Sequence, residues 1–474
     1  MVEKIKVDFK KKNGILACSP HILKLVREKF SIVNPSYQMR RIVPRLYSIT
    51  PAGAFQIGLW NEVENYLRSL NIQLDISYTD DFTNNFNPIL HITDISKIEG
   101  FDYYDYQEDS IREFLANGRG ITLVATGGGK ALIAGGLSKT LLDHHPDFKI
   151  LIIVPTVGLL NQLHRSFVSE FGIESVTKWG DSNLPDLSKN IVIANSQILI
   201  SDIAHTLSVV QDFDAVIIDE VHTINEKKNK ISKVLHNITT PFKFGMTGTL
   251  PDSIMAVWNV IGKVGPILYE KTSYDLRKQD RITDVEIAVV VCSHTYKPRF
   301  PKNVNPTDAY NKEIEYIIDY APRNAAIVGI VNKLVGNVLI VVDRLDYIDS
   351  LKLAFKDTHK KVLVISGNVK VDDRTDIQDL MEKEEDIILI AMTKCISTGI
   401  SIKNLHYAVF TYMGKGGVKT VQTIGRLVRK HASKEKAVIF DISDDLEYSL
   451  RHLKQRLLIY KDQKIEYKLK KIII

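Results

Sequence analysis

The sequence is poor in the residues that define several classes of protein. It has three cysteines among 474 residues, Cys18, Cys292 and Cys395, too few and too far apart for a disulfide framework or a zinc site. We therefore expect a reducing compartment. No apolar run approaches the roughly 18 residues of a membrane-spanning helix. Charges interrupt the first six residues, unlike a secretory leader. We expect a cytoplasmic protein, in the host cytoplasm if a phage encodes it, with no membrane partner.

Acidic residues are scarce at both ends of the chain. Overall, 25% of the residues are charged, 45% are hydrophobic and the net charge is +6, as in ordinary globular proteins. Residues 1–50, however, hold 11 Lys and Arg against 3 Asp and Glu, and residues 446–474 hold 8 against 3. These basic ends favour contact with a nucleic acid, although two solvated faces would give the same composition.

The first part of the chain reads as a small basic α+β domain over residues 1–95. The pattern predicts strands near residues 6–9 and 39–47, helices beginning near residues 19 and 58, and a turn-rich loop over residues 79–88.

Apolar runs typical of buried parallel strands then recur in two series. The first, at residues 121–124, 150–154, 191–194 and 215–218, predicts an α/β domain over 96–275. The second, at residues 338–342, 362–365, 387–391, 407–411 and 437–441, predicts another over 318–445. Between them we expect a connector over 276–317, with an exposed loop or hairpin at 295–311. A basic helix or tail is expected over 446–474. The predicted fold class is α/β, with two tandem parallel-sheet domains after the α+β domain.

A glycine-rich turn follows the first of these strands and precedes a predicted helix. Residues 124–131 read Val-Ala-Thr-Gly-Gly-Gly-Lys-Ala. Backbone N–H groups, a helix N-terminus and a lysine together can hold phosphate oxygens. Val124 stands where the strict phosphate-loop pattern has glycine, and Ala131 stands where it has a Ser or Thr that ligates Mg²⁺. Taken alone, the segment fits a simple glycine-rich turn equally well.

The strand at 215–218 ends in two carboxylates, Asp219 and Glu220, followed closely by His222. Ligands bind at the carboxyl edge of open parallel sheets, so these side chains lie where chemistry is expected. Asp219 would hold Mg²⁺ and Glu220 would act as a base toward water. The alternative is a capped strand end with solvated acids, and His222 is the least specific of the three.

Two weaker signals lie before and after this pair. Gln107, ahead of a predicted helix, can offer a donor and an acceptor to adenine, but an ordinary surface glutamine has the same chemistry. Arg426 and Arg429 share one face if they lie on a helix, and two guanidiniums can neutralise a γ-phosphate. A basic helix facing a nucleic acid is the alternative.

Further short motifs connect these signals in a fixed order. The series is Y-Q, A-T-G-G-G-K, I-I-V-P-T, N-S-Q, D-E-V-H, G-M-T-G-T-L, S-T-G-I-S and Q-x-x-G-R-x-x-R, over about residues 100–445. This ordered set resembles that of superfamily 2 helicases. Within the superfamily, residues 397–405 and 425–431 resemble the phage branch-migration DNA helicases most closely.

The resemblance implies two RecA-like domains and an ATP-dependent DNA helicase that uses ATP and Mg²⁺. It implies action on branched DNA, such as forks and Holliday junctions, in recombination, replication or repair. It also implies three-prime to five-prime travel, and we expect a monomer. A duplex-DNA translocase, an RNA helicase, and a nucleic-acid-binding protein whose ATPase is impaired by Ala131 all stay open. The strand-separating element would be the segment at 295–311 or the N-terminal domain.

The resemblance also assigns roles to individual residues. For the nucleotide it implies Gln107 at adenine, Thr126, Gly127, Gly128, Gly129, Lys130 and Ala131 at the phosphates, Asp219 and Glu220 at the metal and water, and Gln422, Arg426 and Arg429 as catalytic residues. For the nucleic acid it implies Pro155, Thr156, Asn195, Ser196, Gln197 and Thr393 along one strand, which suits groups that contact phosphates without reading sequence. His222, Thr247 and Thr249 would couple the two sites. Because Ala131 lacks the usual hydroxyl, we predict reduced ATP turnover with nucleotide binding partly kept.

Overall fold

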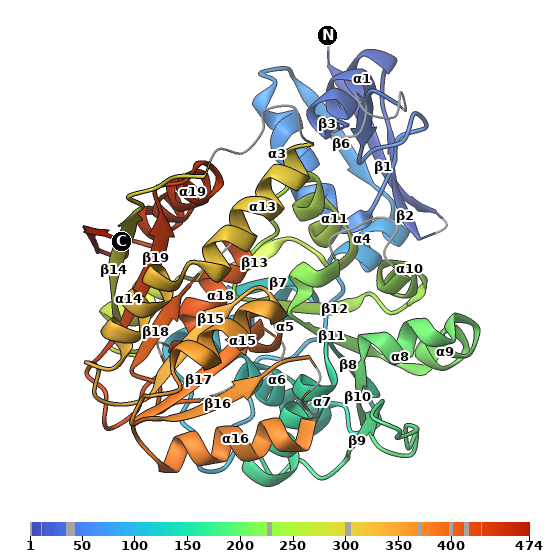
Figure 1. Cartoon of the computed structure of the whole chain (residues 1–474). Coiled ribbons are helices and arrows are strands. Elements are labelled where there is room, and N and C mark those ends of the chain that lie inside the picture. Colours follow the sequence, from blue (N-terminus) through green and yellow to red (C-terminus); the bar gives the residue numbers. More distant parts are fainter. Residues whose placement is uncertain are drawn as a thin grey trace. The chain divides into compact units, whose positions relative to one another are not determined.

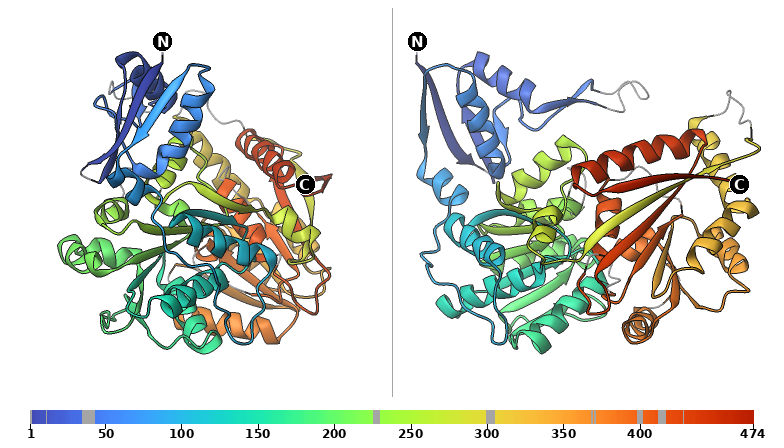
Figure 2. Two further views of the ribbon diagram at one scale, coloured as in Figure 1. Left: turned by 180° about the vertical axis from the view of Figure 1, so that it is seen from behind. Right: turned by 90° about the vertical axis from the view of Figure 1, so that its left-hand side faces the viewer.

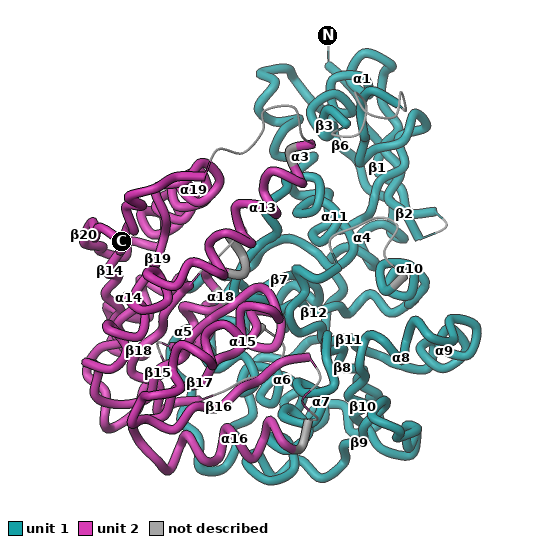
Figure 3. Tube along the Cα trace, viewed as in Figure 1, with its two compact units in different colours: residues 1–124, 129–271 teal, residues 125–128, 272–474 magenta. Residues whose placement is uncertain are grey.

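The computed structural model describes residues 2–10, 12–34, 43–224, 230–298, 305–367, 369, 371–397, 402–411, 417–427 and 429–474. The chain forms two compact units (Figure 3), one of residues 1–124 with 129–271 and one of residues 125–128 with 272–474. No helix among the described residues combines the length and apolar character that crossing a membrane requires.

The N-terminal domain is built on a four-stranded sheet with the order β5-β2-β1-β6. Its central strand β1 (Glu3–Lys10) alternates buried and exposed residues, and it pairs antiparallel with β2 (Asn13–Ala17) and parallel with β6 (Leu74–Tyr78). The other elements are α1 (Pro20–Lys29), β3 (Ser31–Val33), β4 (Arg45–Tyr47), β5 (Ala54–Phe55), η1 (Ile57–Leu59), α3 (Trp60–Ser69) and α4 (Asp80–Phe86). The predicted first strand and both helices are confirmed. Strand β4 corresponds to the C-terminal end of the basic strand predicted over residues 39–47, and residues 39–42 lie outside the described residues.

The loop predicted over residues 79–88 is wrong, because α4 occupies most of it. Thr79 caps this helix by accepting a hydrogen bond from Phe82 N, and Asp80 and Asp81 lie in its first turn. Carboxylates stabilise a helix N-terminus, and the buried rings of Phe82 and Phe86 are one turn apart. The polar composition of the segment hid this short apolar stripe.

The first α/β domain has a seven-stranded, fully parallel sheet, and this is one of two RecA-like domains. In spatial order its strands are β13 (Ile267–Lys271), β7 (Arg119–Val124), β12 (Phe242–Thr247), β11 (Ala215–Asp219), β8 (Ile150–Val154), β10 (Ile191–Asn195) and β9 (Val176–Trp179). The four predicted strands are all present. The sequence pattern missed β9, β12 and β13; in β12 a lysine and a glycine interrupt the apolar run.

Helices connect these strands, as parallel pairing requires. They are α5 (Asp105–Asn117), α6 (Lys130–His144), α7 (Val157–Arg165), η2 (Ser166–Glu170), α8 (Ser196–Ser201), α9 (Ile203–Val209), η3 (Val210–Asp212), η4 (Val221–Ile224), α10 (Lys230–Asn237) and α11 (Ile254–Val264). Figure 1 shows the N-terminal domain next to α11 of this domain, and a continuous apolar core joins the two, for example where the rings of Phe30 and Trp258 lie 5.1 Å apart. The N-terminal domain is therefore anchored on α11 within the same compact unit.

The second RecA-like domain also has seven parallel strands. In spatial order they are β16 (Lys361–Ile365), β17 (Ile387–Met392), β15 (Val338–Val342), β18 (Tyr407–Phe410), β19 (Lys436–Asp444), β14 (Asp284–Ser293) and β20 (Tyr467–Ile473). Its helices are α12 (Ser273–Lys278), α13 (Pro306–Asp319), α14 (Ala321–Val331), α15 (Leu345–Ala354), α16 (Val371–Lys383), α17 (Thr393–Ser397), α18 (Gly417–Leu427) and α19 (Glu447–Asp462). The five strands predicted here are all present.

Two segments outside the predicted second domain belong to its sheet. The expected connector over 276–317 contributes β14, which lies between β19 and β20 (Figure 2). The C-terminal tail contributes β20, an edge strand whose exposed lysines hid the pattern. The C-terminal helix α19 packs on the same domain through buried Arg456, which pairs with Asp441 at 2.8 Å. Residues 299–304 of the predicted loop or hairpin lie outside the described residues.

Candidate functional site

The glycine-rich turn leaves the buried strand β7 and enters α6 at Lys130. Gly127 and Gly129 have φ angles of +90° and +78°, in the left-handed region that favours glycine. Gly129 is the N-cap of α6, so the first N–H groups of that helix have no acceptor within the helix. The turn and the positive end of the helix dipole thus form an anion-binding geometry.

The Lys130 side chain lies between this turn and the end of β11. Its Nζ donates to the carbonyl oxygen of Val124 at 3.4 Å and lies 3.8 Å from Glu220 Oε1. Both side chains are largely covered, with 12% and 18% exposed. An ammonium group has three donors, so Lys130 retains donors for a phosphate oxygen.

Glu220 is held in a strained and specific position. Its φ angle is +48°, which costs a residue with a Cβ about 1–2 kcal/mol. His222 Nδ1 lies 3.3 Å from Glu220 Oε2, and Thr247 Oγ1 lies 3.3 Å from the same oxygen. His222 and Thr247 are themselves 2.8 Å apart. Two of the predicted coupling residues therefore contact the predicted base directly, and backbone strain of this kind concentrates at functional sites.

Thr249, the third predicted coupling residue, lies beside this group. Its backbone N–H donates to Thr247 Oγ1 at 3.3 Å, and Thr247 Oγ1 lies 2.9 Å from its carbonyl oxygen. The Thr249 hydroxyl is buried and makes no hydrogen bond to any described residue. Since a buried hydroxyl without a hydrogen-bond partner is costly, the Thr249 hydroxyl is suited to bond a ligand group.

Asp219 ends β11 and its environment fits a cation. Burial, followed by the neighbouring Glu220 carboxylate, raises the pKa of Asp219 to about 6, although Lys130 acts in the opposite direction. Its Oδ1 accepts a hydrogen bond from Glu220 N at 2.9 Å. A divalent cation that arrives with a triphosphate would relieve the repulsion between these carboxylates. Ala131, the second residue of α6, offers no oxygen ligand to such a cation.

Gln107 lies against the phosphate turn. The residue is 3% exposed, and its Oε1 accepts a hydrogen bond from Tyr104 N at 3.0 Å. A Cβ added to Gly129 would lie 2.4 Å from Gln107 Nε2. Gln107 thus ties the start of α5 to the turn, while its contact with adenine stays a prediction. The exposed ring of Tyr104 stacks on Tyr106 with centroids 5.8 Å apart. Tyr104 was not predicted as a site residue, although the aromatic cluster at residues 103–106 was visible in the sequence.

The residues predicted to hold a nucleic-acid strand follow two adjacent strands, β8 and β10. Thr156 Oγ1 caps α7 by accepting from Leu159 N, and Asn195 Oδ1 caps α8 by accepting from Gln197 N. The Ser196 hydroxyl donates to the carbonyl oxygen of Pro155 at 3.3 Å. The structure therefore brings these five residues, Pro155, Thr156, Asn195, Ser196 and Gln197, to one edge of the sheet, with Gln197 exposed.

The second unit holds the remaining predicted residues. Thr393 begins α17 and is buried, and its hydroxyl donates to the carbonyl oxygen of Val342 at 3.3 Å. The helix predicted to carry both arginines ends at Leu427, so Arg426 lies on α18 and Arg429 follows it. Burial, followed by the charge of Arg426, lowers the pKa of Arg429 to about 10. The guanidiniums are thus neighbours, although not on one helix. The Gln422 side chain and residues 398–401 lie outside the described part of the chain.

Two protein families match the chain where these sites lie. Residues 100–252 match the family described as "Type III restriction enzyme, res subunit", and residues 323–431 match the "Helicase conserved C-terminal domain". The chain belongs to the superfamily 2 helicases. A superfamily 2 helicase is an ATP-dependent enzyme, so nucleotide use belongs to the class.

Known proteins resemble this superfamily 2 helicase to different extents. The "ATP-dependent DNA helicase uvsW" of Enterobacteria phage T4 is 29% identical over 393 residues, covering 77% of this chain and 76% of the relative. The DNA-bound restriction-modification enzyme LlaBIII has a TM-score of 0.59 at 16% identity, covering 87% of this chain and 34% of that one. Dbp5 of S. cerevisiae, bound to RNA and ADP BeF3, has a TM-score of 0.57 at 12% identity, covering 78% and 89%. At identities of 16% and 12%, LlaBIII and Dbp5 show only that this chain has the same fold. The LlaBIII structure holds DNA, and the Dbp5 structure holds RNA.

Proposed function

We propose that this helicase uses ATP and Mg²⁺ to separate the strands of branched DNA, such as forks and Holliday junctions, in recombination, replication or repair. The observation that carries the proposal is the contact chain from Lys130 through Glu220 to His222 and Thr247, at the same sheet edge as the candidate strand-binding residues. The name of the phage T4 relative supports DNA, and the motif resemblance supports branched substrates.

At the nucleotide, each side chain has a distinct task. Lys130 and the N–H groups of the turn would bind the β- and γ-phosphates, with Gln107 and the Tyr104 ring near the base. Glu220, oriented by His222 and Thr247, would position water and accept its proton. Mg²⁺ bound at Asp219 would supply positive charge to the phosphate oxygens. Arg426 and Arg429 would neutralise the charge that develops on the γ-phosphate, with Gln422 as a further catalytic residue.

At the nucleic acid, helix N-termini and hydroxyl groups would hold phosphates of one strand. Thr156 and Asn195 cap α7 and α8, so the N-termini of both helices lie at this edge. Thr393 would do the same at α17. His222 and Thr247 contact the base Glu220, and Thr249 contacts Thr247. Release of the γ-phosphate would therefore change the position of Glu220, and Thr249 would transmit this change to the strand-binding residues.

Three other functions make different predictions. A duplex-DNA translocase would hydrolyse ATP without separating strands, and an RNA helicase would separate RNA duplexes. A binding protein with an impaired ATPase is favoured by one specific observation, the methyl group of Ala131 in the first turn of α6.

The test is strand separation on a synthetic four-way junction, a fork, a linear DNA duplex and an RNA duplex. It is run with this chain, its Ala131→Ser variant and a Glu220→Gln variant. We expect ATP-dependent separation of the junction and the fork, faster with Ala131→Ser and absent with Glu220→Gln.

The other outcomes assign the other functions. ATP hydrolysis without separation on any substrate would favour a translocase, and separation of RNA alone would favour an RNA helicase. Tight junction binding without ATP-dependent separation, even with Ala131→Ser, would reject the proposal in favour of the binding protein.

A further inference from the structure

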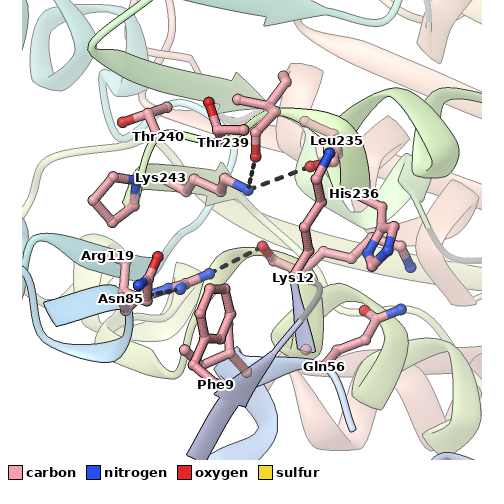
Figure 4. A pocket seen from close by; sticks show the side chains of 15 residues that line it. Phe9, Lys12, Gln56, Asn85, Arg119, Leu235, His236, Thr239, Thr240 and Lys243 are labelled. Atoms are coloured by element: carbon pink, nitrogen blue, oxygen red, sulfur yellow. Dashed lines mark hydrogen bonds between the residues drawn. The ribbon is translucent and has the colours of Figure 1, made fainter. Parts of the chain in front are cut away.

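A pocket lies at the edge of the first parallel sheet that is opposite to the phosphate turn. Strands β7 and β12 begin there with Arg119 and with Phe242 and Lys243, whereas the turn follows the end of β7. The pocket has a volume of about 260 Å³ and is lined by the N-terminal domain and the first RecA-like domain within one compact unit (Figure 4). This volume is far above the roughly 15 Å³ that one water needs, and just below the range of about 300–1,000 Å³ for drug-sized ligands. The pocket therefore suits a small ligand.

The charged side chains that line this pocket are all basic. Lys12, Arg119, Lys243 and Lys263 line it together with His236, and the described lining residues include no Asp or Glu. Three of the four cations are buried, with exposed fractions of 3% for Arg119, 8% for Lys243 and 6% for Lys263. Buried cations are ordinarily paired with carboxylates, so other groups must stabilise the positive charge in this pocket.

Three helices end at this edge, and their carbonyl oxygens compensate part of the positive charge. Arg119 donates to the carbonyl oxygens of Asn85 in α4 and of Lys263 and Val264 in α11, at 2.6, 3.2 and 2.8 Å. Lys243 Nζ donates to the carbonyl oxygens of Leu235 and Ile238 at the end of α10, at 3.3 and 3.0 Å. Figure 4 marks hydrogen bonds of the Lys243 ammonium with dashed lines. The cations thus cap the negative ends of helix dipoles.

The helix ends do not balance the charge. Each helix C-terminus carries about −0.5 of an elementary charge, or about −1.5 for three helices, against as much as about +3 from Lys12, Arg119 and Lys243. The remaining positive potential acts on the groups inside. Burial, followed by the charges of Arg119 and Lys12, lowers the pKa of Lys243 to about 7. Burial, followed by the charges of Lys243, Lys12 and Lys263, lowers the pKa of His236.

A neutral polar group in the same pocket lacks a hydrogen-bond partner among the described residues. Gln56 Oε1 is buried and makes no hydrogen bond to any described residue. It lies close to α11, where a Cβ added to Gly262 would come 3.0 Å from it. Rotation of the amide about its last bond would present the NH₂ group, a donor, at the same point. An oxygen-rich anion would therefore satisfy Gln56 and the excess positive charge together.

We propose that this pocket binds a phosphate group, either free phosphate or a phosphate monoester at the end of a nucleotide or nucleic-acid strand. Its excess of positive charge matches a dianion, and Lys12, Arg119, Lys243 and Gln56 supply donors around the space. The site is separate from the phosphate turn, so it would be filled independently of ATP. Since Lys12 also donates to Asn237 of α10 at 3.2 Å, a bound phosphate would stabilise the docking of the N-terminal domain.

The test measures phosphate binding calorimetrically in a Lys130→Ala background, which weakens binding at the phosphate turn. The probes are inorganic phosphate and a short oligonucleotide with a 5′-phosphate or a 5′-hydroxyl. The test variant is Lys12→Ala, whose side chain is exposed, and the matched control is Lys6→Ala, an exposed lysine of β1 outside the pocket. Lys243→Met is a second variant that keeps an apolar stem.

We expect one phosphate-containing probe to bind with one-to-one stoichiometry. Its dissociation constant should rise about tenfold with Lys12→Ala or Lys243→Met, the loss of one charge-assisted hydrogen bond, and stay unchanged with Lys6→Ala. Binding of inorganic phosphate would identify free phosphate as the source, and binding only of the 5′-phosphorylated strand would identify strand ends. No binding of inorganic phosphate together with equal binding of the phosphorylated and hydroxyl strands, no binding of any probe, or equal affinity of Lys12→Ala and Lys6→Ala for the bound probe would overturn the proposal. None of these results depends on strand separation.

Discussion

Replacing Ala131 by serine should increase ATP turnover. Ala131 lies in the first turn of α6, directly after Lys130, and the Cα–Cβ bonds of a helix tilt toward its N-terminus. A hydroxyl at this position would therefore point toward the phosphate turn, on the same side as a cation held by Asp219. The substitution supplies the one oxygen ligand that the strict phosphate-loop pattern contains and this chain lacks.

The size of the effect follows from the interaction gained. A hydrogen bond or ligand contact to a charged group is worth about 1.5–3 kcal/mol, which corresponds to roughly a 10- to 150-fold increase in kcat if it is realised in the transition state. The cost in stability is small, because serine in place of alanine in a helix loses about 0.5 kcal/mol.

The assay is steady-state ATP hydrolysis with saturating DNA, titrated with Mg²⁺, for the wild-type chain and Ala131→Ser. We expect a higher kcat and a lower Mg²⁺ concentration at half-maximal rate. Nucleotide affinity in the presence of a chelator is the control and should be equal for the two chains. Equal rates at every Mg²⁺ concentration would refute the reasoning, since the missing hydroxyl would then not limit metal positioning.

Four further predictions concern other groups. Asp219→Asn should abolish ATPase activity yet raise Tm at pH 7.5 in calorimetry. Because the native pKa of Asp219 is raised to about 6, the stability advantage of Asp219→Asn over the wild type should grow as pH rises from about 4 to about 6, and a difference that stays constant over this range would contradict this. Gly129→Ala should weaken ATP binding at least about tenfold in a fluorescence titration, since its φ is left-handed and the new Cβ would meet Gln107. Thr79→Ala should lower the free energy of unfolding by about 1 kcal/mol in urea, through loss of the α4 cap. Phosphate binding near pH 8 should take up protons, since Lys243, which faces Lys12, Arg119, Lys263 and His236, has a pKa lowered to about 7 that an anion would raise. Calorimetry in buffers of different ionisation enthalpy measures this, and zero uptake would count against it.

Local patterns of the sequence determined most of the fold. Runs such as residues 150–154 and 338–342 are apolar throughout because strands of a parallel sheet are buried on both faces, and β8 and β15 occupy those residues. The glycines and lysine of the phosphate turn, and the two acids after β11, were likewise visible because backbone geometry and charge demand those residue types in that order. Among the segments that escaped prediction, β14 and β20 owe their structure to partners distant in the chain.

Contacts between distant segments were decided only by the tertiary structure. The strained backbone of Glu220 and its contacts with His222 and Thr247 depend on β11 and β12 lying side by side, which no local pattern encodes. Gln107 illustrates the same point, because its amide oxygen holds the start of α5 and its amide nitrogen lies against Gly129. The basic pocket depends on three helix ends and two domains meeting at one sheet edge. A lysine such as Lys243 looks like an ordinary strand residue in the sequence, and only its burial among other cations shows that an anion would be stabilised there.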